Sequence, residues 1–455
     1  MIKRLAAIIG KEKVCILGFG AEGQSSFRLL QKIIPGSQII IADKNPATIS
    51  HPLLKDSEIL VQTGEQYLQE IEKCALILKT PGIPFGELAH IPRKIISSQT
   101  EFFIRSYGRQ IIGITGTKGK STTASLIYHI IRQQTEDVIL VGNMGIPPFD
   151  HIEEIGPDTL IVDELSSHQL EHIEVSPHTS LLLNLYEEHL DHYEGKEDYF
   201  RAKINIARYQ QKEDTFIYNA EDAETARLMH QTPLAGTMIP VCSAVHEGLC
   251  CFPQHDTLIF QTDAGNQTRF SAHSGCALKG LHNRMNILFA IAACKTNGIT
   301  DAAIEQGISS FKPLAHRMQY VGKFDGIDFY NDSIATIPEA TIAAVKAIPN
   351  IATLILGGYD RGIDYHGLAT FLAGTSISNL IFLGAAGKRM MEIIGQLQVK
   401  NIVLLEAASM EEAVRLAKKQ TPPGKVCLLS PAAASYDTFK NFEERGAVFM
   451  QLAAS

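Results

Sequence analysis

The sequence predicts an α/β protein of three domains, and three features of its 455 residues lead to this prediction. Short runs of β-branched and other apolar residues alternate with amphipathic stretches, a pattern that favours parallel sheets with crossover helices. The predicted strands end in Gly, Asp, Asn or Ser. At about 150 residues per domain, the length is enough for three hydrophobic cores. We expect the domains to span residues 1–99, 100–314 and 315–455.

The predicted strands fall into one group per domain. The first domain contains "KVCILGFG", "SQIIIADK" and "CALILKTPGIP". The second contains "RQIIGITG", "VILVGNMG", "TLIVDELSS" and "TSLLLNLYEEH", and the third contains "GIDFYNDS", "IATLILGGYDRG", "NLIFLGAAG" and "KVCLLSPAAAS". Ligands of open α/β sheets bind at the carboxyl ends of the strands. The polar residues at these strand ends are therefore the candidate site residues.

Composition excludes several other classes of protein. The net charge is −8 and no block of Lys and Arg stands out, which argues against a nucleic-acid partner. No apolar run reaches the roughly 18 residues that span a bilayer, and "MIKRLAAIIGKEK" is too short in apolar residues for a signal peptide. The eight cysteines form no CxxC pair, which argues against a disulfide framework. We expect a monomeric cytoplasmic protein without membrane insertion.

The stretch "GITGTKGKSTT" predicts a site for a nucleoside triphosphate. A buried strand over Ile111–Ile114 runs into a Gly-rich turn, and a helix follows over Ser121–Gln133. The turn can aim backbone N–H groups at an anion, and the helix N-terminus adds partial positive charge. Lys120 can reach the terminal phosphates and Ser121 can ligate Mg²⁺. The sequence departs from the GxxxxGK[ST] pattern, because Ile114 stands where the first Gly is expected. The alternative is an ordinary Gly-rich turn between a strand and a helix.

A second Gly-rich turn, "GFGAEG", follows the first predicted strand. Asp43 lies 20 residues after Gly23 of this turn, which is the spacing of a dinucleotide-binding fingerprint. A uridine nucleotide could occupy the same crevice, with Asp43 on a base or ribose donor. An NAD-dependent dehydrogenase is the alternative, but hydride chemistry leaves the other Gly-rich turn unexplained.

The segment "DELSSHQLEH" permits two interpretations. His168, Glu171 and His172 match the H-x-x-E-H pattern of inverted zinc peptidases. Glu164 ends a predicted strand, and its hard carboxylate suits Mg²⁺. No accompanying feature requires zinc, so we favour a magnesium site over a zinc peptidase.

His189 and Lys203 lie further along, in "NLYEEHLDHYEGKEDYFRAKINI". His189 follows a predicted strand, and an ordinary polar loop residue is the alternative. Lys203 adjoins an apolar stripe at helical spacing, so it could pack inward or extend to solvent as a snorkelling lysine. The stripe consists of Tyr199, Ala202, Ile206 and Tyr209.

Together these motifs resemble the Mur ligase family, the ATP-dependent amino-acid ligases of peptidoglycan precursor synthesis. The resemblance covers nearly the whole chain and is strongest to the glutamate-adding branch. Cyanophycin-type and folylpolyglutamate-type ligases fit both ends of the chain poorly. The motifs are "TGTKGKSTT", "VGNMG", "ELSSHQLE", "LYEEHLDHY", "RAKINI", "YNAED", "KGLHNRMN", "PLAHRMQ", "YNDSIAT", "LGGYDRG" and "LSPAAASYDTFKNFEERG".

The resemblance implies three domains, each with its own ligand. These are an N-terminal Rossmann-like uridine nucleotide domain, a central P-loop ATPase-like domain and a C-terminal Rossmann-like domain for the amino acid. The implied ATP-binding residues are Gly116, Thr117, Gly119, Lys120, Ser121, Thr122, Asn283, Asn286, Arg317 and Asp332. The implied magnesium ligands are Ser121, Glu164, His189 and a carbamylated Lys203. The implied catalytic residues are Lys120, His189 and Lys203.

The resemblance also implies the substrates and the reaction. The carboxylate of UDP-N-acetylmuramoyl-L-alanine would attack the γ-phosphate of ATP, and the amine of glutamate would then attack the acyl phosphate. The implied substrate-binding residues are Gly18, Gly20, Ala21, Glu22, Asp43, Pro81, Gly82, Asn143, Ser166, Arg361, Ser435 and Phe442.

Two positions depart from the family's pattern at the glutamate site. Ile334 in "NDSIAT" and Arg361 in "GGYDRG" stand where lysines are expected. Arg and Lys differ at a carboxylate site, because one presents a planar fork and the other a point charge. We favour D-glutamate as the added amino acid, and L-glutamate is the alternative.

Overall fold

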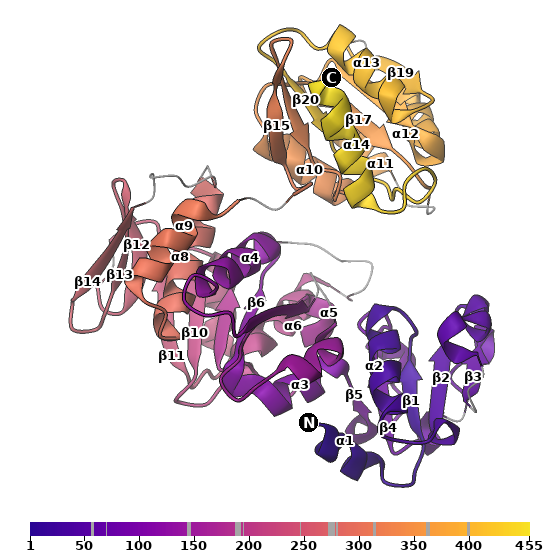
Figure 1. Ribbon diagram of the computed structural model, residues 1–455, viewed down its shortest axis with the longest axis vertical. Helices are drawn as coiled ribbons and strands as arrows, with labels where there is room; N and C mark the ends of the chain where they lie inside the picture. The colour runs from indigo at the N-terminus through magenta and orange to yellow at the C-terminus, as the bar shows by residue number, and fades with distance from the viewer. Residues whose placement is uncertain are drawn as a thin grey trace. The chain divides into compact units, whose positions relative to one another are not determined.

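The structure is a computed structural model that confirms the α/β fold class (Figure 1). It describes residues 1–55, 59–69, 71–142, 147–186, 193, 195–245, 247–271, 278, 281–312, 315–360, 365–397 and 401–455. The chain divides into two compact units, Met1–Lys312 and Pro313–Ser455. Two of its three sheets lie in the first unit and one in the second.

The first sheet is parallel, with the strand order β3-β2-β1-β4-β5. Its central strands are continuous apolar runs because both faces are covered, as the fully buried β1 illustrates. The order reverses between β1 and β4, so their carboxyl ends border a crevice suited to a ligand. The elements are α1 (Ile2–Ile9), β1 (Val14–Leu17), α2 (Ala21–Gln31), β2 (Ile39–Asp43), β3 (Leu60–Thr63), β4 (Leu76–Lys79) and β5 (Ile96–Ser97).

The second sheet carries the candidate triphosphate site, and its order is β14-β13-β12-β11-β10-β9-β6-β8-β7. The order reverses between β6 and β9, and α4 packs against α8 and α9 (Figure 1). The strands are β6 (Ile111–Thr115), β7 (Val138–Gly142), β8 (Leu160–Glu164), β9 (Thr179–Leu182), β10 (Thr215–Asn219), β11 (Thr237–Val241), β12 (Cys250–Gln254), β13 (Thr257–Gln261) and β14 (Gln267–Ser271). The helices are α3 (Gln99–Tyr107), α4 (Lys120–Ile131), α5 (Ser167–Leu170), α6 (Lys196–Arg208), α7 (Ala223–Gln231), α8 (Leu281–Thr296) and α9 (Asp301–Ser310).

The sequence did not indicate the antiparallel edge of this sheet. Strands β12, β13 and β14 form a meander that extends the parallel sheet beyond β11. Cys250, Cys251 and Phe252 are fully buried in it. The described cysteines are all buried, and none of them forms a disulfide, in agreement with the sequence-based expectation.

Direct polar contacts join the first and second sheets within the first unit. Arg28 of α2 forms a bidentate pair with Asp150, with N–O distances of 3.1 and 2.6 Å. Lys32 of α2 approaches Glu153 at 2.6 Å, and both side chains are exposed. Such exposed pairs contribute little stability singly, but a bidentate guanidinium fixes an orientation.

The second unit contains a sheet of order β15-β16-β20-β17-β18-β19, which is parallel except for β15. The strands are β15 (Gln319–Phe324), β16 (Ile327–Asn331), β17 (Ile351–Gly357), β18 (Asn379–Leu383), β19 (Val403–Ala407) and β20 (Val426–Leu429). The helices are α10 (Pro338–Ala347), α11 (His366–Ala373), α12 (Gly384–Gln396), α13 (Met410–Gln420) and α14 (Phe442–Ala454).

Replacing Gly23 by Ala tests how closely α2 packs on the first Gly-rich turn. A Cβ at Gly23 would lie 2.1 Å from the carbonyl oxygen of Gly18. Overpacking against backbone outweighs the helix preference of Ala, so we expect a loss of about 2 kcal/mol in unfolding free energy by urea titration. The control is Gly86→Ala, where nothing lies within 4 Å of the added Cβ. Equal stability of the two variants would contradict this packing.

Candidate active site

The predicted triphosphate turn, residues 116–119, connects β6 to α4 and is called the phosphate loop below. Gly116 has φ of 151° and Gly119 has φ of 85°, values that side-chain-bearing residues rarely adopt. Helix α4 begins at Lys120, so its first free N–H groups face the loop. Ser121 is buried in the first helical turn, and Thr122 beside it is half-buried.

The segment after β9 holds the phosphate loop in place. The amide of Thr117 donates to the carbonyl of Asn184 at 3.0 Å, and the amide of Lys118 donates to its side-chain oxygen at 2.8 Å. The Thr117 hydroxyl accepts from the amide of Tyr186 at 3.0 Å and lies 3.2 Å from the hydroxyl of Tyr199. Because β6 and β9 flank the point where the strand order reverses, the loop is anchored at the ligand-binding edge of the sheet.

Two lysines from different helices donate to one carbonyl oxygen of this loop. Lys120 of α4 reaches the oxygen of Gly116 at 2.8 Å, and Lys203 of α6 reaches the same oxygen at 2.9 Å. Lys203 is only 1% exposed, and its ammonium lies 4.8 Å from the centre of the Tyr199 ring. The snorkelling interpretation of Lys203 is therefore wrong. The fold places both ammonium groups at the phosphate loop.

Helix α8 contacts the phosphate loop from another side. A Cβ at Gly119 would lie 2.6 Å from the side-chain oxygen of Asn286, so Asn286 packs directly on this glycine. The side-chain amide of Asn286 donates to the side-chain oxygen of Asn283 at 3.2 Å. The structure thus brings Asn286 to the loop and places Asn283 next to Asn286.

The end of β8 supplies buried carboxylates beside the phosphate loop. Glu164 pairs in register with Ile114, and the next amide, of Leu165, donates to the carbonyl of Ile114 at 2.8 Å. Neither carboxylate oxygen of the neighbouring Asp163 has a hydrogen-bond partner, and burial raises the pKa of Asp163 to about 8. The sequence did not indicate Asp163, because it precedes the strand end.

The donor set at this edge suits a hard divalent cation. The hydroxyl of Ser121 and the carboxylate of Glu164 are oxygen donors of the kind that Mg²⁺ prefers. Among the described residues, no three His, Cys, Asp or Glu side chains form a metal-binding group. The predicted ligand His189 and the predicted substrate residue Asn143 lie outside the described residues.

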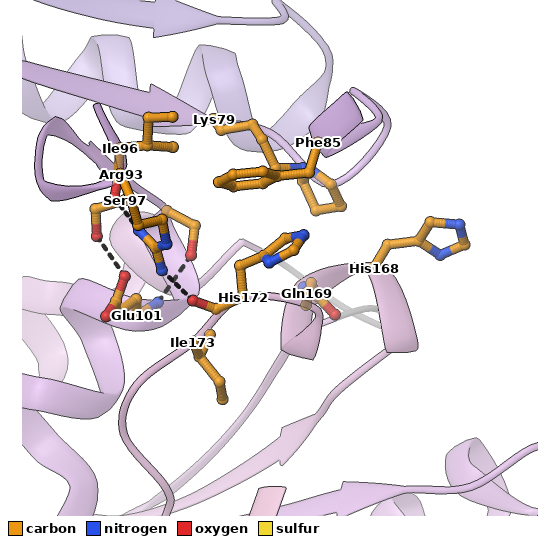
Figure 2. Close-up of a pocket in the computed structure, with 12 residues that line it drawn as sticks. Lys79, Phe85, Arg93, Ile96, Ser97, Glu101, His168, Gln169, His172 and Ile173 are labelled. Atoms are coloured by element: carbon orange, nitrogen blue, oxygen red, sulfur yellow. Dashed lines mark hydrogen bonds between the residues drawn. The ribbon is translucent and has the colours of Figure 1, made fainter. Parts of the chain in front are cut away.

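The H-x-x-E-H pattern does not form a zinc-binding face. Helix α5 ends at Leu170, before the last two residues of the pattern, so its histidines do not share a helical face. The ring of His172 packs on Phe85, with centroids 3.7 Å apart (Figure 2). Its Nε2 lies 3.3 Å from a carboxylate oxygen of Glu171.

The predicted uridine-nucleotide residues surround the crevice of the first sheet. Gly18 and Gly20 follow β1, and Pro81 and Gly82 follow β4. The carboxylate of Asp43, at the end of β2, accepts from the amides of Phe19 at 2.6 Å and Asn45 at 2.8 Å. Asp43 therefore fixes the Gly-rich turn, a contact that spacing alone did not indicate. Ala21 and Glu22 open α2.

A pocket lies where this crevice meets the second domain of the sequence prediction (Figure 2). Lys79, Pro81 and Phe85 line it from one side, and His168 and Gln169 from the other. Ser166 caps α5 beside it, and its hydroxyl accepts from the amide of Gln169 at 3.3 Å.

In the second unit, Asp332 lies buried just after β16. Its carboxylate accepts from the hydroxyl of Ser430 at 2.7 Å and the amide of Met318 at 3.1 Å. Burial raises the pKa of Asp332 to about 7, although these hydrogen bonds and the charge of Arg317 oppose the rise. The charge of Arg317 therefore acts on Asp332, and their predicted role in binding ADP remains a prediction.

A buried arginine that the sequence did not indicate holds the segments with the residues that were predicted to bind the substrate glutamate. Arg445 is 2% exposed and donates to the carbonyls of Ser333, Ala433 and Ala434 at 2.7, 3.0 and 3.1 Å. It thereby fixes the backbone just before the buried Ser435. Phe442 is also held, since its carbonyl accepts from the hydroxyl of Ser333 at 2.8 Å. The motif "LSPAAASYDTFKNFEERG" contains Arg445, but the burial of this residue was not evident from the sequence. Arg361 lies outside the described residues.

Family models match both units of the chain. One, described as Mur ligase middle domain, matches residues 114–294, and another, described as Mur ligase, glutamate ligase domain, matches residues 316–433. The chain belongs to the Mur ligase family. It is therefore an ATP-dependent amide ligase that acts in peptidoglycan precursor synthesis, and the sequence-based assignment to this family is confirmed.

Several curated relatives match this Mur ligase over nearly its full length. A UDP-N-acetylmuramoylalanine--D-glutamate ligase of Clostridium kluyveri is 32% identical over 97% of this chain and 96% of the relative. The enzyme of the same name from Listeria monocytogenes serotype 4b is 32% identical over 96% of this chain and 95% of the relative.

Solved structures support the same fold. MurF from Acinetobacter baumannii has a TM-score of 0.57 at 16% identity and covers 98% of this chain and 92% of its own. MurF ligase from Thermotoga maritima, in complex with ADP, has a TM-score of 0.54 at 15% identity and covers 97% of this chain and 94% of its own. In the described part of the chain, no helix is both long and apolar enough to cross a bilayer.

Replacing Gly119 by Ala tests the shape of the phosphate loop. The change forces a side-chain-bearing residue to φ of 85° and places its Cβ 2.6 Å from Asn286. At roughly 1–2 kcal/mol for the left-handed backbone, we expect ATP affinity to fall about tenfold in calorimetric titration. Gly108→Ala, whose Cβ would meet ordinary contacts at 3.7 Å, serves as the control and should bind ATP normally. Unchanged affinity of Gly119→Ala would contradict the loop geometry.

Proposed function

We propose that this Mur ligase joins D-glutamate to UDP-N-acetylmuramoyl-L-alanine and cleaves ATP to ADP and phosphate. The observation that carries the proposal is the convergence of Lys120 and Lys203 on the carbonyl of Gly116, beside the buried Glu164. The names of the relatives, which match over nearly the full chain, support this choice of substrates.

The phosphate loop and Lys120 bind the phosphates of ATP in this proposal. Loop amides and the start of α4 present partial positive charge, and Lys120 adds a full charge near the transferring phosphoryl group. In the structure, Lys120 donates to the carbonyls of Gly116 and Thr117, and in this proposal phosphate oxygens of ATP replace these acceptors. Positive charge of this kind is the main contribution that a protein makes to phosphoryl transfer. Asn283 and Asn286 contact the nucleotide beside Gly119, and Arg317 and Asp332 are the ADP residues of the second unit.

Ser121, Glu164, His189 and a carbamylated Lys203 hold Mg²⁺ in this proposal. When bound, Mg²⁺ neutralises phosphate charge and polarises the bond that breaks. Lys203 suits carbamylation because its ammonium is buried, and a buried lysine loses its proton more easily. The carbamate would replace a cation with a hard oxygen ligand.

The uridine nucleotide binds in the crevice of the first sheet, at Gly18, Gly20 and Gly82, and the muramoyl part extends towards Ser166. The carboxylate of the L-alanine residue attacks the γ-phosphorus of ATP, and ADP leaves. The amine of glutamate then attacks the acyl carbon, loses a proton, and inorganic phosphate leaves. The amide bond therefore forms at the expense of one phosphoanhydride bond.

Two positions in the proposed glutamate site are a reason to consider L-glutamate as the alternative substrate. Ile334 carries no charge where a lysine is expected, and its side chain is half-buried beside the Asp332 segment. Arg361 replaces the other expected lysine, and its fork binds a carboxylate in a different geometry. Ser435 and Phe442 remain the proposed glutamate contacts.

The substrate assay measures phosphate release with ATP, UDP-N-acetylmuramoyl-L-alanine and either enantiomer of glutamate. We expect release with D-glutamate to exceed release with L-glutamate by at least about tenfold, a difference of about 1.4 kcal/mol in transition-state stabilisation. A preference for L-glutamate would overturn the stereochemical assignment, and no release with either would overturn the choice of substrates.

Lysine replacements test the two charges at Gly116. Lys120→Ala should lower kcat by at least about a thousandfold, because a full charge at the phosphoryl group is lost. Lys203→Ala should lose activity in the same assay and regain part of it with acetate or bicarbonate, which can replace the carbamate. The exposed Lys212→Ala is the matched control and should keep wild-type activity. Full activity of Lys120→Ala would show that the loop does not bind the reacting phosphates.

A further inference from the structure

A carboxylate of the first sheet's domain reaches a residue of the second. Glu22, in the first turn of α2, accepts a hydrogen bond at 2.7 Å from the side-chain amide nitrogen of Gln169 in α5. The two residues are 147 positions apart in the sequence. The other oxygen of Glu22 is buried and has no hydrogen-bond partner.

The opposite end of the Gln169 side chain holds the start of α5. Its amide oxygen accepts from the backbone N–H of Ser166 at 2.9 Å and from the hydroxyl of Ser166 at 3.0 Å. The backbone N–H of Gln169 in turn donates to that hydroxyl at 3.3 Å, which completes a capping box. Ser166 stands two residues after Glu164.

The carboxylate of Glu22 determines the orientation of the Gln169 amide. In its ionised form this carboxylate only accepts hydrogen bonds, so the NH₂ end of Gln169 faces it and the oxygen faces Ser166. With an apolar residue at position 22, the NH₂ end would lose its acceptor, and the amide could reverse at the expense of the capping box.

Burial of the Glu22 carboxylate between the two sheets costs free energy, so this contact adds little to stability. Burial raises the pKa of Glu22 to about 7, partly offset by the Gln169 hydrogen bond and by Lys79. Lys79, whose own pKa burial lowers to about 8, donates to the carbonyl of Ile83 at 2.7 Å. Asp163 and Glu171 also face this group of charges. Apolar contacts can often replace buried charges without loss of stability. The presence of charged residues here therefore indicates a role other than stabilising the contact between the parts around the two sheets.

We propose that Glu22 is a positioning residue, which orients Gln169 and thereby fixes the Ser166 turn and the adjacent Glu164. The 164–166 segment is then held at one end by the Leu165–Ile114 hydrogen bond and at the other by Gln169. Because Glu22 lies two residues after Gly20, the segment proposed to bind the uridine nucleotide also supports the proposed magnesium end of the site. This inference rests on the proposed function.

The pH dependence of stability tests the burial of Glu22. Its pKa of about 7 lies above the ordinary value of 4.5, so the folded state binds more protons between these values. Stability from this group is therefore full below pH 4.5 and is lost as pH rises through 7. Glu22→Gln does not titrate, so its melting temperature relative to wild type should rise between pH 5 and pH 8. The titratable neighbours Lys79, Glu171 and Asp163 are present in both proteins. A difference in melting temperature that stays constant between pH 5 and pH 8 would contradict the burial of an ionised Glu22.

Three variants test the positioning role in the full-length enzyme. Glu22→Ala removes the acceptor, Glu22→Gln keeps an acceptor oxygen, and the exposed Glu12→Gln is the matched control. The measurements are kcat and KM for the uridine nucleotide, calorimetric binding of Mg²⁺ with ADP, and hydrogen exchange of the peptide that contains Ser166. A hydrogen bond to a charged group is strong enough that its loss should change each affected quantity about tenfold.

Positioning predicts a specific combination of results. Glu22→Ala should lower kcat, weaken Mg²⁺–ADP binding and speed exchange at Ser166, and Glu22→Gln should recover most of each. If Glu22 instead bound the nucleotide substrate directly, KM would rise while exchange and Mg²⁺–ADP binding stayed at wild-type values, and the inference would be overturned. Exchange and metal–nucleotide binding need no turnover, so an inactive wild-type enzyme would count against the proposed function and not against this inference.

Discussion

The carbonyl oxygen of Gly116 is the point on which the active site depends. One oxygen with two lone pairs accepts from Lys120 and from Lys203, which arrive on helices more than 80 residues apart in the chain. Two ammonium groups repel each other at this distance, so a neutral carbonyl alone does not balance them. An anionic ligand bound at the phosphate loop would supply the missing negative charge. The site is thus prepared electrostatically for phosphate before any ligand arrives.

Sheet topology explains why these groups meet. In the first and second sheets, two neighbouring strands (β1 and β4, β6 and β9) lead to their next strands in opposite directions, which leaves a crevice at their carboxyl ends. The phosphate loop follows one such strand, β6, and the Asn184–Tyr186 segment that fixes it follows the other, β9. In the second unit, Asp332 and Ser430 likewise follow adjacent strands and bond to each other. The same rule of parallel sheets therefore builds a polar edge three times in one chain.

Most of the fold was evident from the sequence because buried parallel strands are continuous apolar runs. The eleven quoted strands all form, and the Gly-rich turns lie where the pattern placed them. The β12–β14 meander was missed although its loops are short and the one between β13 and β14 contains Gly265, a hairpin signal. Lys120 was identifiable from local spacing, whereas the burial of Lys203 and Arg445 depends on neighbours distant in sequence. The family resemblance supplied the role of Lys203 but could not supply its contact with Gly116.

The polar contacts between the first two sheets also bear on how this enzyme can be recombined with its relatives. Arg28–Asp150 and Glu22–Gln169 each join residues from opposite sides of residue 99, so a crossover there separates partners that fit one another. A crossover near residue 312 falls between the two compact units. Chimeras that exchange the second unit as a whole should therefore keep the contacts within the first unit, whereas chimeras cut near residue 99 would separate the exposed Arg28–Asp150 pair and the part-buried Glu22–Gln169 hydrogen bond.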